Sequence, residues 1–297
     1  MQVEAIKPGT YVLAVSGGVD SMVLLDVLRQ NPQLQLVVAH YEHGIRPDAD
    51  QDRQLVEAVA ASHDIPFVCA HGRLGTGASE AVARDARYAF LEEVRATHDA
   101  QAIITAHHQD DLLETGIINM LRGTGRKGLS SLRSTEHLLR PLLQATKQDI
   151  YAYATAHGLA WREDSTNMQD KYLRNHVRHR LLPRLDAGAK RLLLTYMERA
   201  AAVNPLIDVL LQQDIAAHSS EGGLQRGWFI MLPHSVSCEV MAAWLRQQGI
   251  RTFDRKTIDR LVVLAKTGRP GKQGDIGAGY SLEVTKTILQ VRPRYVS

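Results

Sequence analysis

The feature that most constrains the fold is a repeated alternation of short apolar runs with segments of helical spacing. The runs lie at 11–15, 34–40, 66–70 and 101–106, and the helix-like segments that follow them lie at about 22–28, 50–62, 79–97 and 110–122. The run at 11–15 is apolar throughout and the others are mostly so, which is typical of strands buried on both faces. The pattern therefore predicts an α/β fold with a doubly wound parallel sheet, covered by helices on both faces.

The second half of the chain has a looser pattern. The segment GTGRKGLSSLRS after residue 122 is expected to form a mobile loop, and a helix is expected from Thr146, its N-cap, to Gly158. Further on, the sequence predicts a basic helical segment at 171–200, a strand near 227–232, helices at 236–248 and 254–266, and strand-like pieces near 280–292. A boundary near 215 divides the chain into a first domain at 1–215 and a smaller, mainly helical domain at 216–297.

Composition places the chain among globular proteins. Of 297 residues, 44% are hydrophobic and 23% charged, and the net charge is +3. No apolar run approaches the roughly 18 residues of a membrane span, and the polar start does not resemble a secretory signal, so we expect a cytoplasmic protein without a membrane partner. The two cysteines, Cys69 and Cys238, lie far apart and predict two buried free thiols, neither a disulfide framework nor a metal-binding pair.

A polar, glycine-containing segment follows the first apolar run: Ser16-Gly17-Gly18-Val19-Asp20-Ser21. Glycine lets a ligand approach the backbone closely, and N–H groups at a helix start attract anions. The segment fits an anion cradle, with a turn capped by Asp20 or Ser21 as the alternative. Neither G-x-x-x-x-G-K-S/T nor G-x-G-x-x-G is present. Because Asp20 would repel a phosphate, a cation such as Mg²⁺ would have to stand between them.

This segment resembles the SGGxDS loop of the PP-loop ATP pyrophosphatases, enzymes that cleave ATP between the α- and β-phosphates and adenylate an acceptor. The resemblance implies an adenine nucleotide alpha hydrolase-like fold and an ATP site that contains the whole loop from Ser16 to Ser21. It extends this site to Ala39 and His40 at the end of the second strand. It also implies that Asp20 takes part in catalysis and in holding Mg²⁺.

A longer motif narrows the resemblance. AHHQDDLLETGIINMLRGTGRKGLSSL at 106–132 is similar to the signature of tRNA(Ile)-lysidine synthetases, and so are HYEHGIR at 40–46, EAVARDARYAFL at 80–91, RPLL at 140–143 and REDSTN at 162–167. The resemblance implies a C–N ligase. ATP would activate the C2 oxygen of the wobble cytidine in a tRNA(Ile) with a CAU anticodon. The ε-amine of free L-lysine would then replace it, giving lysidine, AMP and pyrophosphate.

Three acids, Asp110, Asp111 and Glu114, stand at the start of the helix after the fourth strand, with Asp110 and Glu114 on one face. Acids at this end of a helix are favoured by the dipole alone, and they can also bind a cation, either Mg²⁺ or an amino group. The resemblance implies that Asp111 and Glu114 recognise lysine. Asp110 is expected to help Asp20 to hold Mg²⁺.

The attacking amine needs a base, because the unperturbed pKa of lysine is near 10.4. His107 is the first candidate, and His108 and Asp111 are its rivals. Arg84 and Arg87 are expected to assist catalysis through contacts with the α-phosphate or the RNA backbone; a solvated helix face is the alternative.

Basic residues are expected to contact the tRNA. Between 170 and 200, basic residues outnumber acidic ones eight to three, which suits phosphate contacts as well as an ordinary solvated helix. The expected tRNA contacts are Arg122, Arg126, Lys127, Arg174 and Arg178.

Two other functions compete with this interpretation. A thiolase of the same superfamily would typically use clustered cysteines, and a catalytically inactive RNA-binding relative would lose the acids and the glycine loop. The sequence leaves the oligomeric state open, a homodimer included.

Overall fold

A computed structural model of the chain describes residues 1–42, 49–72, 80–162, 173–220 and 222–294. The chain forms two compact units. Unit 1 contains residues 1–118 and 131–194, and unit 2 contains residues 119–130 and 195–297. Apart from residues 119–130, unit 2 begins at Thr195, which is earlier than the domain boundary expected near 215.

Unit 1 is built on a parallel sheet of five strands in the order β3-β2-β1-β4-β5. The strands are β1 (Gly9–Ala14), β2 (Leu34–Glu42), β3 (Phe67–His71), β4 (Ala102–Ile104) and β5 (Leu138–Leu139). The four predicted strands are confirmed, and the parallel sheet with them. The two-residue β5 was not predicted, because so short a strand leaves no periodic signal.

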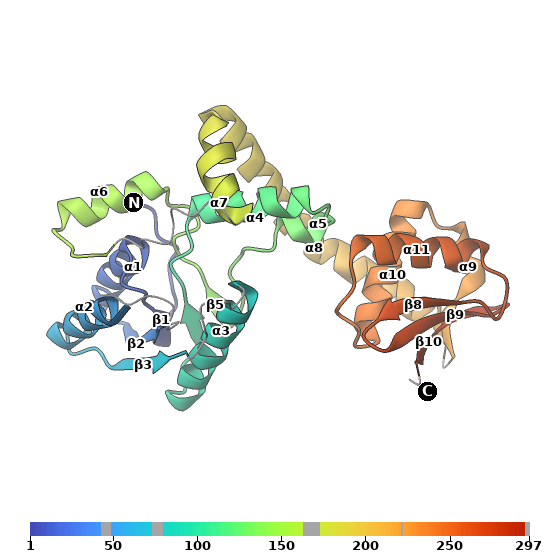
Figure 1. Cartoon of the computed structure of the whole chain (residues 1–297), viewed down its shortest axis with the longest axis horizontal. Coiled ribbons are helices and arrows are strands. Elements are labelled where there is room, and N and C mark those ends of the chain that lie inside the picture. The colour runs from blue at the N-terminus through green and yellow to red at the C-terminus, as the bar shows by residue number, and fades with distance from the viewer. Residues whose placement is uncertain (43–48, 73–79, 163–172, 221, 295–297) are drawn as a thin grey trace. The chain divides into compact units, whose positions relative to one another are not determined.

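Helices cover both faces of this sheet, as Figure 1 shows. They are α1 (Val19–Arg29), α2 (Ala49–Ser62), α3 (Glu80–Thr97) and α6 (Lys147–Ala156), while α4 (Gln109–Leu121), which follows β4, contributes to a separate core. Side chains alternate between the faces of a strand. Leu13 accordingly packs in the core that contains α1, α2 and α6, whereas Val12 packs against Leu91 and Val94 of α3. The fold is therefore a doubly wound α/β sheet.

The basic segment after residue 172 is helical but broken. It consists of α7 (Leu173–His176), a π-helical turn η2 (Val177–Leu181), a 3-10 turn η3 (Leu182–Arg184) and α8 (Ala187–Ala217). Val177 and Leu182 pack against Leu113 and Ile117 of α4 in a small separate core. This core brings the basic segment to the helix that carries the predicted acids. The sequence motifs at 43–46 and 163–167, and residues 170–172, lie outside the described residues.

Unit 2 combines helices with an antiparallel sheet. The helices are α5 (Arg126–Leu129), α9 (Arg226–Met231), α10 (His234–Gln247) and α11 (Arg255–Thr267), with the second part of α8. The strands are β6 (Ser219–Ser220), β7 (Gly223–Gln225), β8 (Gln273–Gly277), β9 (Tyr280–Val284) and β10 (Ile288–Pro293), in the order β6-β7-β10-β9-β8. Phe229, Trp244 and Leu261 are central to its core.

Three sequence-based expectations were wrong in detail. The segment 227–232 belongs to helix α9, not to a strand, because a six-residue apolar run fits either structure. The expected loop after residue 122 contains helix α5. Cys69 is exposed and Cys238 only partly buried, so the thiols are free but not buried. Within the described ranges, no helix is long and apolar enough to cross a membrane.

Candidate active site

The sheet topology brings two loops together at one edge. From β1 the chain moves to β2 and β3 on one side, and it returns to place β4 on the other side of β1. The loops that follow β1 and β4 therefore flank the point where the strand order reverses. Ligands of open α/β sheets bind at such a point, beyond the carboxyl ends of the strands.

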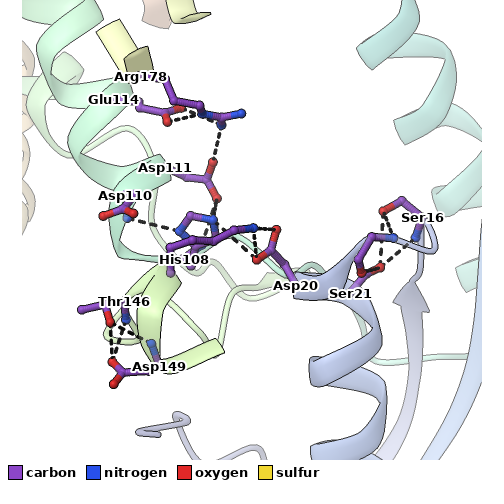
Figure 2. A network of polar contacts seen from close by, with 12 residues as sticks. Ser16, Asp20, Ser21, His108, Asp110, Asp111, Glu114, Thr146, Asp149 and Arg178 are labelled. Carbon is purple, nitrogen blue, oxygen red and sulfur yellow. Dashed lines mark hydrogen bonds and ion pairs between the residues drawn. The ribbon is translucent and has the colours of Figure 1, made fainter. Parts of the chain in front are cut away.

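The loop after β1 forms the open start of α1. Gly17 has φ +89°, and a Cβ atom there would lie 3.3 Å from Cβ of Asp52, so this position requires glycine. Gly18 is the N-cap, and no side chain of a described residue caps the helix. The turn capped by Asp20 or Ser21 is therefore wrong. Ser21 Oγ instead accepts from Ser16 N at 3.2 Å and donates to Gly18 O at 2.9 Å, which braces the loop (Figure 2).

Asp20 points away from this loop toward the elements that follow β4 (Figure 2). Its two carboxylate oxygens accept from Lys147 Nζ at 2.6 and 2.8 Å. Lys147 is the first residue of α6, whose start is closed by a capping box between Thr146 and Asp149. A cation at a helix start opposes the dipole. This unfavourable position is the one sequence signal that could have identified Lys147, which sequence reasoning missed.

His108 connects Asp20 to the acids of α4. Its Nε2 lies 3.7 Å from Asp20 Oδ1 and 3.5 Å from Asp111 Oδ2, and its backbone N–H donates to Asp111 Oδ2 at 3.0 Å. Asp111 therefore also stabilises the start of α4. Burial alone would raise the pKa of Asp111, but the charge of His108, the hydrogen bond from the His108 backbone N–H and the charge of Arg178 outweigh it and lower this pKa.

Glu114 is 1% exposed, and its carboxylate forms an ion pair with an arginine side chain. Arg178 donates from Nε to Oε1 at 2.5 Å and from Nη2 to Oε2 at 2.9 Å, while the same Nη2 lies 3.4 Å from Asp111 Oδ1. Arg174 Nε lies 3.7 Å from Glu114 Oε2. Burial raises the pKa of Glu114 despite these partners. Asp111 and Glu114 thus hold one side-chain cation between them (Figure 2).

A cluster of arginines surrounds His107. Burial lowers the pKa of His107 to about 3, and the charges of Arg140, Arg87 and Arg84 act in the same direction. The ring Nδ1 is 2.8 Å from Thr105 Oγ1. Among the described residues, no partner meets the buried Nε atoms of Arg87 and Arg140. These donors are suited to an anionic ligand. Arg140 was not among the site residues expected from the sequence.

His40 and Ala39 of β2 contact the backbone of the residue that follows β1. Nδ1 of the buried His40 lies 2.8 Å from Val15 O, and Val15 N donates to Ala39 O at 3.0 Å. Burial lowers the pKa of His40, so its ring is neutral near pH 7. Both residues therefore position the backbone that leads into the glycine turn.

Residues 2–185 match the family of the PP-loop domain. The chain belongs to this family. The matched residues cover most of unit 1, and they include the segment from Ser16 to Ser21, which resembles the SGGxDS loop, together with the contacts of Asp20, His108 and Glu114 described above.

Relatives with curated names extend the similarity beyond the PP-loop domain. A "tRNA(Ile)-lysidine synthase" of Geobacter sulfurreducens is 37% identical over 236 residues, which are 73% of this chain and 50% of the relative. A protein of the same name from Ralstonia nicotianae is 34% identical over 270 residues, 85% of this chain and 58% of the relative. The matches thus span about half the length of these relatives.

One solved structure shares the fold at low identity. It is a U34-tRNA thiolase from Methanococcus maripaludis, with a TM-score of 0.52 and 16% identity over 66% of this chain and 74% of that one. This likeness supports the PP-loop fold and says nothing about the acceptor.

The residues expected to contact tRNA are partly engaged within the protein. Arg126 joins Asp208, Glu239 and Asn204 of unit 2 at distances of 2.5, 3.0 and 2.9 Å, and its side chain is 16% exposed. Arg126 therefore lies in a short helix and not in the expected mobile loop, and these pairs indicate a structural role, whereas its expected contact with tRNA stays a prediction. Lys127 is more exposed but pairs with Asp208 at 2.9 Å.

The other predicted tRNA contacts differ from one another. Arg122 is exposed, whereas the guanidinium groups of Arg174 and Arg178 face Glu114. Their contact with RNA stays a prediction.

Proposed function

We propose that the chain acts as a tRNA(Ile)-lysidine synthase, which adenylates the C2 oxygen of a wobble cytidine and replaces this oxygen with the ε-amine of lysine. The observation that carries the proposal is the pairing of Asp111 and Glu114 around one side-chain cation, joined through His108 to Asp20 of the PP-loop. Such an arrangement provides an amine-binding pair next to a site for the phosphates of ATP. The names of the relatives support the same activity.

The first step needs stabilisation of a departing pyrophosphate. The cytidine O2 attacks the α-phosphorus of ATP, and the bond to the β-phosphate oxygen breaks. The uncapped N–H groups at the start of α1 and the ammonium of Lys147 offer positive charge to the leaving group. The unpartnered Nε donors of Arg87 and Arg140 suit the adenylate or the RNA backbone.

The second step needs a bound, deprotonated amine. The ε-nitrogen of lysine attacks C2, and AMP leaves with the former O2. We infer that the lysine amine takes the place that Arg178 occupies between Asp111 and Glu114. Glu114 is the better proton acceptor of these two acids, because burial raises its pKa while the neighbouring charges lower that of Asp111. With a pKa of about 3, His107 is too weak a base for this step and fits an orienting role.

Mg²⁺ fits the residues at the PP-loop. This ion commonly binds through one or two carboxylates together with substrate phosphates. Asp20 offers one such carboxylate when its ion pair with Lys147 is broken. Bound with ATP, Mg²⁺ would supply charge neutralisation for the phosphates. Asp110 donates its backbone N–H to His108 Nδ1 at 3.3 Å, and a metal-binding role for its carboxylate stays a prediction.

The test is the formation of AMP and pyrophosphate from ATP, with Mg²⁺, L-lysine and an unmodified tRNA bearing a CAU anticodon. Both products should depend on the tRNA. Asp20→Asn should abolish pyrophosphate release and leave tRNA affinity nearly unchanged, whereas Asp50→Asn, on the surface of α2, serves as the matched control. Lost tRNA affinity in Asp20→Asn would contradict the assignment of Asp20 to adenylation.

The alternatives give different products. ATP turnover with a small acid and no RNA would overturn the proposal, and sulfur incorporation into the tRNA would favour a thiolase. An inactive RNA-binding relative would bind the tRNA without consuming ATP. The proposal retains the cytoplasmic location expected from the sequence and leaves the oligomeric state open.

A further inference from the structure

Three potential metal ligands meet on two helices of unit 2, away from the PP-loop. His234 and Cys238 are four residues apart on α10 and therefore share a face, one turn apart. Asp259 stands in the first half of α11, whose start is set by its N-cap Asp254. Packing of Val240 and Met241 with Ile258 and Leu261 holds the two helices together and fixes Asp259 opposite the α10 pair.

The distances between the three ligand atoms match a tetrahedral metal site. Nε2 of His234 lies 3.3 Å from Oδ1 of Asp259, and Sγ of Cys238 lies 3.3 Å from the same oxygen and 3.6 Å from Nε2. Zinc binds sulfur at about 2.3 Å and nitrogen or oxygen at about 2.0–2.2 Å, so tetrahedral angles put two nitrogen or oxygen ligands about 3.3–3.6 Å apart and a sulfur ligand about 3.5–3.7 Å from either. The three ligand atoms thus lie within a few tenths of an ångström of the separations that coordination requires.

Neighbouring charges leave these ligand atoms available. Arg255 approaches Asp259 at Oδ2, at 3.8 Å, and not at the oxygen that faces His234 and Cys238. The side chains of His234 and Asp259 are 57% and 44% exposed, so water could satisfy the hydrogen-bonding groups of both. Burial therefore does not account for the short distance between them. In the metal-free chain Cys238 is a thiol, since partial burial and Asp259 raise its pKa to about 11, and it donates to Asp259. A metal ion would displace the thiol proton to solvent and replace this weak hydrogen bond with coordination by the thiolate.

We propose that His234, Cys238 and Asp259 form a binding site for a zinc-like divalent cation, with a fourth position open. Thiolate, imidazole and carboxylate together are a donor set that zinc accepts. The three residues line a pocket of about 810 Å³ within unit 2, shared with Arg122, Arg246 and Arg255, and the open position can take water or an anion from it. The bound ion would clamp α10 to α11 and stabilise unit 2. This site is independent of the proposed lysidine synthase activity.

The experiment loads the chelator-treated full chain with Zn²⁺ or Co²⁺. Calorimetry should show one tight Zn²⁺ site, and the Co²⁺ form should show a thiolate charge-transfer band and tetrahedral d–d bands. Cys69→Ser, which removes the exposed thiol of unit 1, is the matched control and should retain all of these signals. Cys238→Ser should lose the thiolate band and bind Zn²⁺ at least about tenfold more weakly, because a ligand is removed. Asp259→Asn should weaken binding in the same way.

Other outcomes would overturn the proposal. The chain has 13 histidines, so weak zinc binding elsewhere is expected. Binding that Cys238→Ser and Asp259→Asn leave unchanged would indicate an adventitious ion only. If a variant fails to fold, the Co²⁺ spectrum of Cys69→Ser still decides the matter, since Cys238 is then the one remaining thiol. A thiolate band in it supports the site, and its absence contradicts it.

Discussion

At the scale of residues, acidic and basic side chains alternate through the site, and each one contacts the next. Lys147 pairs with Asp20, His108 stands between Asp20 and Asp111, and Arg178 bridges Asp111 and Glu114. Each carboxylate therefore has a protein cation beside it in the ligand-free chain, which offsets the cost of burying it. We propose that a substrate amine or a metal ion replaces one of these partners, so that binding would be an exchange of cations.

The pairing of Lys147 with Asp20 predicts a large effect on activity and a small effect on stability when Lys147 is replaced. Lys147→Ala should lower the rate of pyrophosphate release at least about tenfold, because a positive charge at the leaving group is lost. The free energy of unfolding should change by less than about 1 kcal/mol, since the lost ion pair, whose side chains are 32% and 29% exposed, is partly offset by removing a cation from a helix start. Measurements of kcat and of chemical unfolding check both effects.

The control for this variant is Lys190→Ala, which removes a lysine from the first turn of α8. It should leave pyrophosphate release unchanged. A Lys147→Ala enzyme that is fully active would show that the ammonium only pairs with Asp20.

The low pKa of His107 predicts a small catalytic effect. At about 3, this pKa lies below the pH range of any assay, and the ring stays neutral from pH 5 to pH 9. His107→Ala should therefore keep the shape of the pH–rate profile between pH 6 and 9 and lose less than about tenfold in kcat. A true general base contributes typically about 10²–10⁴-fold. Disappearance of an inflection together with so large a loss would restore His107 as the base; Thr105→Val, which removes the ring's partner, is the control.

At the scale of elements, the short α5 is a structural link within unit 2. Arg126 directs its guanidinium to Asn204 and Asp208 of α8 and to Glu239 of α10. Arg126→Ala removes the guanidinium that donates to these groups; Asp208 keeps its pairing with Lys127, and the buried Asn204 loses most. The free energy of unfolding should fall by about 2 kcal/mol, as measured by thermal or chemical melting.

The tRNA affinity separates this structural role from an RNA contact. At a temperature where Arg126→Ala is folded, its affinity for tRNA should match that of the wild type within about twofold. Lys127→Ala, one residue further on and 45% exposed at its side chain, is the matched variant for a surface charge. Unchanged stability with lost affinity in Arg126→Ala would mean that Arg126 contacts the RNA.

The sequence predicted elements best where local pattern decides them. Continuous apolar runs identified β1 to β4, and the capping residue Thr146 marked the start of α6. The helix α9 was mistaken for a strand because a short apolar run carries no period, and β5 was too short to see.

Among site residues, local motifs revealed Asp20, Asp111 and Glu114, but not what each one faces. Lys147 reaches Asp20 across 127 positions of sequence, and Arg178 reaches Glu114 across 64. Such pairs are set by the packing of α6 on α1 and of α7 and η2 on α4, which no local pattern encodes.

At the scale of the whole molecule, the chemistry divides between the two units. The PP-loop, the arginine cluster and the acids of α4 belong to unit 1, whereas the pocket with His234, Cys238 and Asp259 belongs to unit 2. We therefore expect substitutions in the unit 2 cluster to leave the adenylation step unchanged. The longer relatives share both the PP-loop domain and part of unit 2 with this chain.

The most direct test of the central claim is the mass of the wobble nucleoside after reaction. The chain is incubated with ATP, Mg²⁺, L-lysine and unmodified tRNA with a CAU anticodon, and the tRNA is digested to nucleosides. We predict a cytidine heavier by one lysine less one water, formed only with ATP and absent from a tRNA with uridine at the wobble position. An unaltered cytidine, with ATP consumed and the tRNA bound, would contradict the proposed activity.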